Sequence, residues 1–491
     1  MKKQQTTLIF LIFLISITIF SENEIMQLSE IKNGMSGTGY TVVQGKSISK
    51  FKFEVLNIIP GEKSINKMIL AKFYDGAIKA SGGISEGMSG SPLYINGKLI
   101  GALSYVADSG AKNIGLVTPI EEIRKLENHY NKNNLDKKNN DIIPGMAIAI
   151  SPVHGDINLD SIGTLTYVDG NSFCALGHPF DRIGRTHLFI KKADILYSIP
   201  SSENSFKLGK GNEIFGLVLE DRDSGIAGII SNEIETYKFN LEINIGNQVK
   251  KVFFEMPKDI NIIKNYLGKS IELGLDKVTN SNEYYTSSYD YTLYDNESNR
   301  IYSNSNFLYF ENNLIESISL IVTDEIITIL DNPFRQITFN DMVLSINLYK
   351  NKKIAYLNNL NIAKRVIKLG EDLNLELEYF LYQGLKKRKE IIIKVPIDFT
   401  IGNAEVIIKR NKENQIRKSD FKNFEEYNDY YKTMHKNNEI IIEINGKNDH
   451  KIIKKVYLDA YLQGEKELKK NIIIDTFEAN YEEKIDDSKI R

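Results

Sequence analysis

The segment that most constrains the fold is SGGISEGMSGSPLYINGKLIGALSYV, residues 81–106. Its second half holds two short apolar runs separated by Asn96-Gly97, the strongest short-range signal for a β-hairpin with a two-residue turn. Similar strand patterns are dense on its N-terminal side, for example in FKFEVLNII and KMILAKFY. A second strand-rich region follows, with another hairpin signal at Asp169-Gly170. These patterns predict two all-β units of similar size.

The N-terminus has the pattern of a secretory signal peptide. Lys2 and Lys3 precede an apolar run from Leu8 to Phe20, and Ser21 supplies a small residue before a cleavage position. The run is shorter than the roughly 20 residues that a membrane-spanning helix needs. We therefore expect export to the periplasm or the exterior, with cleavage after Ser21. An uncleaved anchor is the alternative, because Ile19 is bulky for the third position before cleavage.

Composition argues against several classes of function. The 62 basic and 64 acidic residues nearly cancel, so the net charge does not favour a nucleic-acid partner. Cys174 is the only cysteine, which excludes an intrachain disulfide and any multi-cysteine metal site. The sequence has no HExxH, no Walker loop after a strand and no GxGxxG ahead of a helix. We expect no cofactor and no metal.

The stretch GMSGSP contains a serine in a setting that suits acyl transfer. A nucleophilic serine must sit on a tight turn, with backbone N–H groups directed at the oxygen that becomes negative. Gly87 can point its own N–H and that of Ser89 at one position, Gly90 lets the chain turn away, and Pro92 fixes the exit into the next strand. The motif predicts Ser89 as nucleophile, with an oxyanion hole from Gly87 and Ser89 and with Ser91 as a packing residue. The alternative is a small residue at a hairpin entry.

A nucleophilic serine needs a base, and the chain has six histidines. His178 in FCALGHPFDRIG lies where an apolar strand breaks at Gly177, so its ring can stand at a barrel edge and face a cleft. His187 is the second candidate for the general base. The other four end a helix or lie in turns and polar loops: His129, His154, His435 and His450. A strand-end histidine bonded to backbone is the alternative for His178.

These two segments carry a family resemblance. GGISEGMSGSPLYINGKLIGAL closely resembles the serine segment of the SpoIVB-type peptidases, which are chymotrypsin-like enzymes, and CALGHPFDRIG resembles their histidine segment. IKNGMSGTGYTVVQG and SFKLGKGNEIFGLVLEDRDSGIAGIIS extend the similarity over residues 30–232. The resemblance implies Ser89 as nucleophile, His178 as general base, two β-barrels with the active site between them, and cleavage of narrow specificity.

The chain also departs from that family. In the sporulation enzyme the histidine segment comes first, whereas here Ser89 precedes His178. Unrelated triad enzymes use different chain orders, because catalysis requires only the spatial arrangement. An exchange of barrel order is therefore compatible with activity. We recognise no PDZ-like segment, and the C-terminal β region has no counterpart in the sporulation enzyme.

Several aspartates compete for the role of the triad acid. Asp221 in LEDRDSGIAG follows His178 within the same unit, and we predict it as the orienting acid. Asp75 in FYDGAIKASGG is the rival, because the resemblance places an aspartate ahead of the serine. Asp181 and Asp223 stay open. For each of them the alternative is an ordinary turn residue, since Asp beside Gly is a turn signature.

The remaining chain completes an all-β architecture, a chymotrypsin-like double barrel followed by a β-sandwich-like region. We expect a signal peptide (1–21), a first barrel carrying the nucleophile (22–127), a polar linker (128–143), a second barrel carrying the histidine (144–250), a helical connector (251–284), a β-sandwich-like region (285–480) and a charged tail (481–491).

The sequence thus predicts an exported serine endopeptidase that works through an acyl-enzyme. Its substrate would be a protein or peptide of the cell envelope or the chain itself, and the C-terminal region would meet an envelope protein partner. The alternative is an inactive protease-fold scaffold or binding protein of the envelope. A third hypothesis is sugar binding through the Tyr-rich stretch NEYYTSSYDYTLY, which includes Tyr284 and Tyr285.

Overall fold

The computed structural model describes residues 24–107, 112–129, 141–201, 204–279, 283–411, 421–433 and 436–476. The expected signal peptide, the charged tail and most of the expected linker lie outside these ranges. The chain divides into two compact units, the first made of Met1–Pro152 and Leu159–Ile234, the second of Val153–Asn158 and Glu235–Arg491. Within the described ranges, no helix is both long and apolar enough to cross a bilayer.

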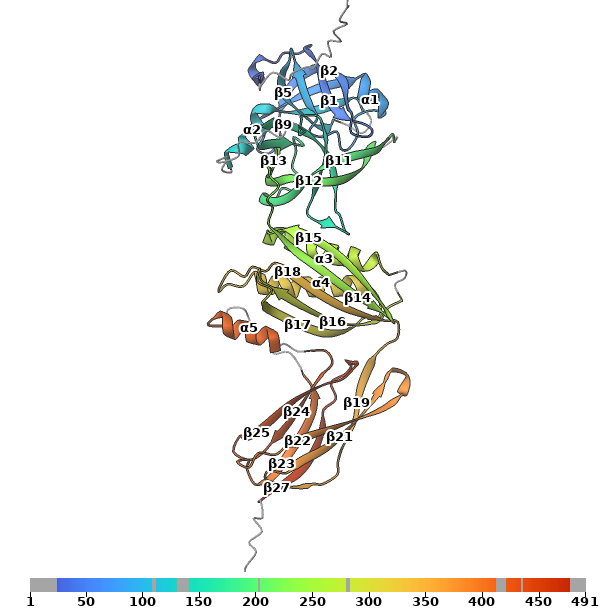
Figure 1. Cartoon of the computed structure of the whole chain (residues 1–491), viewed down its shortest axis with the longest axis vertical. Helices are drawn as coiled ribbons and strands as arrows, with labels where there is room; N and C mark the ends of the chain where they lie inside the picture. The colour runs from blue at the N-terminus through green and yellow to red at the C-terminus, as the bar shows by residue number, and fades with distance from the viewer. Residues whose placement is uncertain are drawn as a thin grey trace, which may run out of the picture. The chain divides into compact units, whose positions relative to one another are not determined.

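The first unit consists of two closed β-barrels of six strands each, drawn from blue to green in Figure 1. This confirms the expected all-β, chymotrypsin-like double barrel. The first barrel has the order β1-β2-β3-β6-β5-β4. Its strands are β1 (Ser36–Val42), β2 (Ile48–Pro60), β3 (Lys67–Tyr74), β4 (Pro92–Ile95), β5 (Lys98–Val106) and β6 (Ile114–Pro119).

The first barrel follows directly from its sequence pattern. Every second side chain of β2 points inward, so that Phe51 and Phe53 are fully buried and pack near Phe73 of β3. The predicted hairpin is confirmed, because Ile95 pairs with Lys98 across Asn96-Gly97. Both turn residues have positive φ, 51° and 80°, as a tight hairpin turn with a right-handed twist demands.

The second barrel has the order β10-β13-β12-β11-β7-β9. The second predicted hairpin is present, but its two-residue turn is Gly170-Asn171 and not Asp169-Gly170, because Asp169 ends β9 and pairs with Ser172. The barrel strands are β7 (Ala147–Ser151), β9 (Ser161–Asp169), β10 (Ser172–Ala175), β11 (Gly184–Ile199), β12 (Phe206–Arg222) and β13 (Gly225–Ile230). Between β3 and β4 lies α1 (Gly76–Ala80), and between the barrels lie α2 (Ile120–Arg124) and a 3-10 turn, η2 (Lys125–His129).

The two barrels share buried apolar side chains. Leu99 and Ile123 on the side of the first barrel belong to one cluster with Tyr167, Cys174 and Ala227 of the second. The single cysteine is therefore buried inside this junction and forms no disulfide. Apolar burial on both sides stabilises the docked arrangement of the barrels.

The second unit begins with a mixed sheet and two helices. The sheet order is β17-β16-β18-β14-β15-β8, and α3 and α4 pack against each other and against the sheet (Figure 1). The elements are β8 (His154–Gly155), β14 (Thr236–Ile245), β15 (Gln248–Pro257), α3 (Ile260–Asp276), β16 (Thr286–Tyr294), β17 (Arg300–Tyr309), α4 (Leu314–Leu330) and β18 (Asp341–Tyr349).

These bounds differ from the expected ones. The second barrel ends at Ile230, and β14 and β15 pair in the separate sheet, where β14 lies parallel to β18. A strand pattern indicates which side chains are buried but not which strand will be the partner. The boundary between the second barrel and this sheet therefore could not be predicted from the sequence. In the Tyr-rich stretch Tyr284, Tyr289 and Tyr291 are buried. A sugar-stacking face through Tyr284 has no support in that packing.

The C-terminal part is a β-sandwich with one core shared by two sheets, ordered β22-β21-β19-β26 and β20-β27-β23-β24-β25. Its elements are β19 (Ile354–Ile362), β20 (Val366–Lys368), β21 (Asp372–Leu381), β22 (Lys386–Lys394), β23 (Gly402–Arg410), α5 (Phe424–Thr433), β24 (Glu439–Asn445), β25 (Lys451–Tyr457), β26 (Tyr461–Leu462) and β27 (Leu468–Asp475).

Candidate active site

The serine turn, residues 87–91, is a sharply bent segment directly ahead of β4. Gly87 and Gly90 have φ of 88° and 93°, which side-chain-bearing residues rarely adopt. A Cβ atom on Gly90 would lie 1.9 Å from the carbonyl oxygen of Thr164. The glycine at position 90 is therefore required both by its conformation and by the close approach of the second barrel.

Backbone hydrogen bonds hold this turn between the two barrels. The N–H of Gly90 donates to the carbonyl of Leu103 in β5, at 2.8 Å. The carbonyl of Ser89 accepts from the N–H of Thr164 in β9, at 2.9 Å, and the carbonyl of Gly90 accepts from the Thr166 hydroxyl, also at 2.8 Å. Ser89 itself is partly buried. The turn is thus fixed from both sides, with Ser89 at its apex.

Two N–H groups of the turn are not engaged by other described residues. Within the described part of the chain, neither the N–H of Gly87 nor that of Ser89 donates a hydrogen bond, whereas Met88, Gly90 and Ser91 each donate to a backbone carbonyl. Such a pair of unengaged donors beside a serine hydroxyl is what an oxyanion hole requires. Ser91 is buried and its hydroxyl donates to the carbonyl of Met88, in keeping with its predicted packing role.

His178 follows a strained bend at the end of β10. Leu176 and Gly177 have φ of 69° and 75°, so the chain turns abruptly after the buried strand. The Gly177 carbonyl accepts from the Thr118 hydroxyl of β6 at 2.6 Å, and a Cβ on Gly177 would lie 2.4 Å from Ser104 Oγ in β5. The first barrel therefore anchors the segment that carries the histidine of the second.

The same strand of the first barrel brings the serine and histidine segments together. Leu103 holds Gly90, and the adjacent Ser104 lies against Gly177. A Cβ on Gly90 would also lie only 2.7 Å from the amide nitrogen of Leu176. In the described structure no hydrogen bond joins Ser89 Oγ to the His178 ring. Catalytic hydrogen bonds are often long in ligand-free enzymes and tighten when substrate binds.

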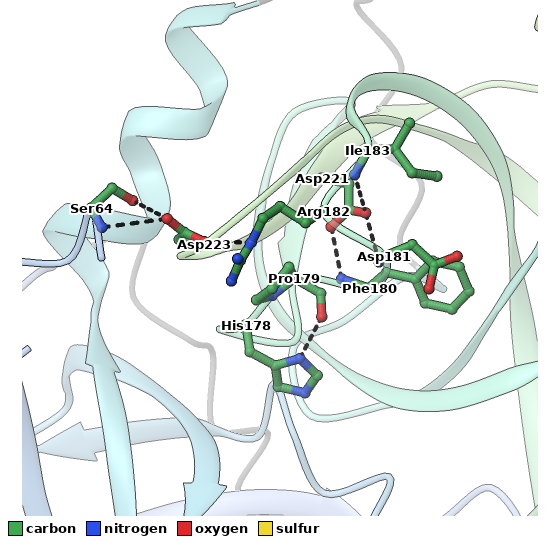
Figure 2. A network of polar contacts seen from close by, with 9 residues as sticks. All are labelled: Ser64, His178, Pro179, Phe180, Asp181, Arg182, Ile183, Asp221 and Asp223. Atoms are coloured by element: carbon green, nitrogen blue, oxygen red, sulfur yellow. Dashed lines mark hydrogen bonds and ion pairs between the residues drawn. The ribbon is translucent and has the colours of Figure 1, made fainter. Parts of the chain in front are cut away.

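The His178 ring has a defined tautomer. Its Nδ1 lies 2.7 Å from the carbonyl oxygen of Pro179 (Figure 2). A carbonyl can only accept, so Nδ1 carries the proton and Nε2 presents its lone pair. Burial lowers the pKa of His178 below its usual value, while the bond to Pro179 and the charge of Asp221 act in the opposite direction. The imidazole is thus neutral at pH 7, as a general base must be.

Asp221 is fully buried in β12 and binds the turn after His178. Its carboxylate accepts from the N–H groups of Phe180, Asp181 and Ile183 at 2.7, 2.8 and 3.1 Å (Figure 2). A trans peptide is planar, with its C=O and N–H on opposite sides. The Pro179–Phe180 peptide therefore gives its N–H to Asp221 and its carbonyl to His178. The aspartate acts on the imidazole through this peptide and makes no direct bond to it.

The rival acids lie elsewhere. Asp75 is exposed and its carboxylate is 3.7 Å from the Lys52 amine. Asp223 is bound to Arg182 at 2.8 Å and to the Ser64 hydroxyl at 2.8 Å, as Figure 2 shows. The Asp181 side chain is exposed at the surface of the turn. Among the described residues, no hydrogen bond joins any of these carboxylates to His178.

The other histidines belong to other parts of the chain. His154 belongs to the second unit, where its Nδ1 lies 3.3 Å from Asn158 Oδ1, and His435 falls outside the described residues. His187 lies on β11. In the part of the chain that the structure describes, no three His, Cys, Asp or Glu side chains gather as metal ligands would.

Two groups of this site were missed by the sequence-based prediction. The carbonyl of Pro179 has no residue signature, because every residue has a carbonyl. Lys207 in β12 is buried and donates to the carbonyl of Gly87 in the serine turn. A lysine at an inward position of the strand FKLGKGNEIF was the only signal available, and the pattern alone does not say which positions face inward.

Comparison with known families identifies the first barrel. Residues 15–121 match the family model described as SpoIVB peptidase S55. The matched range includes the whole serine turn and ends before His178. The resemblance expected from the serine segment is therefore confirmed. A comparison with curated proteins found no match.

Proposed function

We propose that this chain, whose residues 15–121 match the SpoIVB peptidase S55 family model, is an exported serine endopeptidase with Ser89 as nucleophile and His178 as general base. The observation that carries this proposal is the serine turn, in which two unengaged N–H groups flank a partly buried serine. The bend at Leu176 and Gly177 supports it, because it presents a histidine beside the same strand.

The mechanism uses each group in a distinct role. Nε2 of His178 takes the proton of Ser89 as its Oγ attacks the substrate carbonyl, and the N–H groups of Gly87 and Ser89 stabilise the oxyanion. The imidazolium then protonates the leaving amine, and water releases the acyl group by the reverse sequence. The Pro179 carbonyl keeps Nδ1 protonated throughout.

Asp221 completes the site as an orienting acid in this proposal. Its negative charge favours the imidazolium that forms during attack, and its three hydrogen bonds fix the turn that carries the Pro179 carbonyl. It therefore performs the role of a triad aspartate through an intervening peptide group.

The proposed location and substrate rest on other features. The N-terminal pattern of two lysines, an apolar run and Ser21 supports export with removal of the first 21 residues. An exported peptidase meets proteins of the cell envelope, and the family resemblance favours narrow specificity or self-processing. The C-terminal sandwich offers a separate module through which an envelope protein would dock.

The test is covalent labelling of purified residues 22–491 with a fluorophosphonate probe. We expect the wild type to be labelled and both Ser89→Ala and His178→Ala to lose the label. His187→Ala is the matched control, because it removes the other histidine of the second barrel and should leave labelling intact. Absence of label on folded wild type, or label retained by Ser89→Ala, would contradict the proposal. Export is tested separately, by sequencing the N-terminus of the mature chain, which should begin at Glu22.

A further inference from the structure

Beneath the serine turn lies a buried lysine that the mechanism above does not use. Lys207, in the second barrel, is 5% exposed. Its amine donates to the carbonyl of Gly87 at 2.9 Å and to the hydroxyl of Thr41 at 2.7 Å. A buried amine that reaches across a barrel junction to one backbone carbonyl points to a role in holding that carbonyl.

Two threonines complete a ring of hydrogen bonds. Thr41 Oγ1 lies 3.3 Å from Thr164 Oγ1, and the Thr164 hydroxyl donates to the same Gly87 carbonyl at 3.0 Å. The directions agree throughout: Lys207 donates to Thr41, Thr41 to Thr164, and both Thr164 and Lys207 to Gly87. The carbonyl of Gly87 is thus held by two donors, one each from β9 and β12.

The preceding peptide is fixed by the backbone of the same strand. The N–H of Glu86 donates to the Ser205 carbonyl at 2.8 Å, and the N–H of Lys207 donates to the Glu86 carbonyl at 3.0 Å. Because the peptide is planar, a Glu86 carbonyl that points at Lys207 sends the N–H of Gly87 in the opposite direction. That direction leaves this N–H unengaged.

These hydrogen bonds restrict a backbone rotation that would otherwise be easy at Gly87. A glycine rotates its flanking peptides at low cost, so a Gly87 carbonyl that lost its donors could turn and change the direction of the Gly87 N–H relative to that of Ser89. We infer that Lys207 is a positioning residue: its backbone N–H holds the Glu86 carbonyl and its side-chain amine holds the Gly87 carbonyl, which together keep the N–H of Gly87 directed at the oxyanion. The inference rests on the proposed function for its catalytic meaning.

The chemistry of the amine fits a role as donor. Burial lowers the pKa of Lys207 to about 7, and in the described structure no carboxylate pairs with it. A neutral amine has two N–H groups, which match the two acceptors, Thr41 Oγ1 and the Gly87 carbonyl. The lysine therefore serves the turn by its hydrogen bonds and does not need its charge.

The experiment compares Lys207→Met with wild type in two readouts. The first is the second-order rate of fluorophosphonate labelling, which we expect to fall roughly 10- to 100-fold, somewhat less than the loss of a whole oxyanion donor. The second is the direction of the Gly87 carbonyl in crystal structures of both proteins, which we expect to turn in the variant, whereas the Glu86 carbonyl keeps its bond to the backbone N–H of residue 207. Lys191→Met is the matched control, since Lys191 is an equally buried lysine of the same β11–β12 hairpin whose amine pairs with Asp160.

Rescue separates positioning from general destabilisation. In a Cys174→Ala background, which leaves no other thiol to modify, the variant Lys207→Cys, aminoethylated in the unfolded state and refolded, regains an amine of nearly the same reach and should regain most of the labelling rate of the Cys174→Ala protein. If Lys207→Met does not fold, Thr164→Val removes the other donor to Gly87 and should lower the rate about tenfold at most.

The outcomes distinguish this inference from the proposed function. Labelling of Lys207→Met within about twofold of wild type, with the Gly87 carbonyl unmoved, overturns the inference while leaving the peptidase intact. A wild type that is folded but unlabelled, together with a turned carbonyl in the variant, overturns the proposed function and retains the positioning role. An equal rate loss in Lys191→Met would also overturn the inference, because the effect would then be one of stability.

Discussion

Replacing Asp221 by asparagine tests how the turn after His178 is held. The carboxylate accepts three backbone N–H groups, one on Oδ1 and two on Oδ2. Asparagine has one acceptor oxygen, so in its best orientation the amide oxygen keeps the N–H groups of Asp181 and Ile183. Its NH2 group then faces the N–H of Phe180, donor against donor, in a site with no exposure to solvent.

The magnitude follows from these contacts. A hydrogen bond to a charged acceptor contributes about 1.5–3 kcal/mol, and a buried donor left unsatisfied costs about 1–3 kcal/mol. The two bonds that survive become neutral and weaker. We therefore expect Asp221→Asn to lower the free energy of unfolding by about 3 to 5 kcal/mol. Since the Phe180 peptide also carries the Pro179 carbonyl, the His178 ring should lose its partner and the labelling rate should fall.

Urea unfolding of the isolated variant measures the first effect, and fluorophosphonate labelling of the folded fraction measures the second. Asp181→Asn is the control, because its exposed side chain lies in the same turn while its N–H remains bound to Asp221. It should change stability by no more than about 0.5 kcal/mol. A loss below about 1 kcal/mol in Asp221→Asn would refute the three-donor account, since the lost bond alone exceeds it.

Three further predictions concern backbone geometry and pH. Gly90→Ala places a Cβ 1.9 Å from the Thr164 carbonyl oxygen at a φ of 93°, so it should lower the free energy of unfolding in urea by more than about 4 kcal/mol. Gly97→Ala is the control, because its Cβ would meet open space at a φ of 80°, and it should cost about 1 kcal/mol. Similar losses in the two variants would contradict the close packing at Gly90. The pKa of His178 lies below its ordinary value of 6.5, so the labelling rate should be at its maximum at pH 7 and fall only as the pH drops below 6.5. A pH–rate profile with its midpoint above pH 7 would contradict a buried base. Burial lowers the pKa of Lys207 from 10.5 to about 7, so between these values the unfolded chain binds more protons and this group's contribution to stability rises with pH. Relative to Lys207→Met, wild type should gain about 4 kcal/mol between pH 7 and 10 in urea unfolding, and a constant difference would show that the amine is not buried uncharged.

The sequence supported the fold further than the details of the site. The turn at Asn96-Gly97 and a turn at Gly170 were predictable because few residues accept positive φ, and the two barrels followed from strand alternation around them. The pairing of β14 with the distant β18 could not be predicted, because the alternation of apolar and polar residues along a strand does not indicate which strand it pairs with.

The candidate catalytic residues show a similar division. Ser89 and its glycines were suggested by a motif whose spacing has a physical reason, and their catalytic roles, like that of His178, stay predictions until labelling is measured. The partner of the imidazole is a backbone carbonyl, and the donor to Gly87 is a lysine that acts from another barrel. Neither leaves a local pattern, since both depend on how strands distant in sequence come to lie together.

The junction also explains why the order of the two barrels along the chain need not matter. Gly90 of the serine turn is bound by Leu103 from its own barrel and by Thr166 from the other. Gly177, which precedes His178, is bound by Thr118 of the first barrel. Each barrel thus helps to fix the candidate catalytic segment of the other through contacts across the shared interface. These contacts depend on which faces meet and not on which barrel is synthesised first, so an exchange of order preserves the site as long as the interface is preserved.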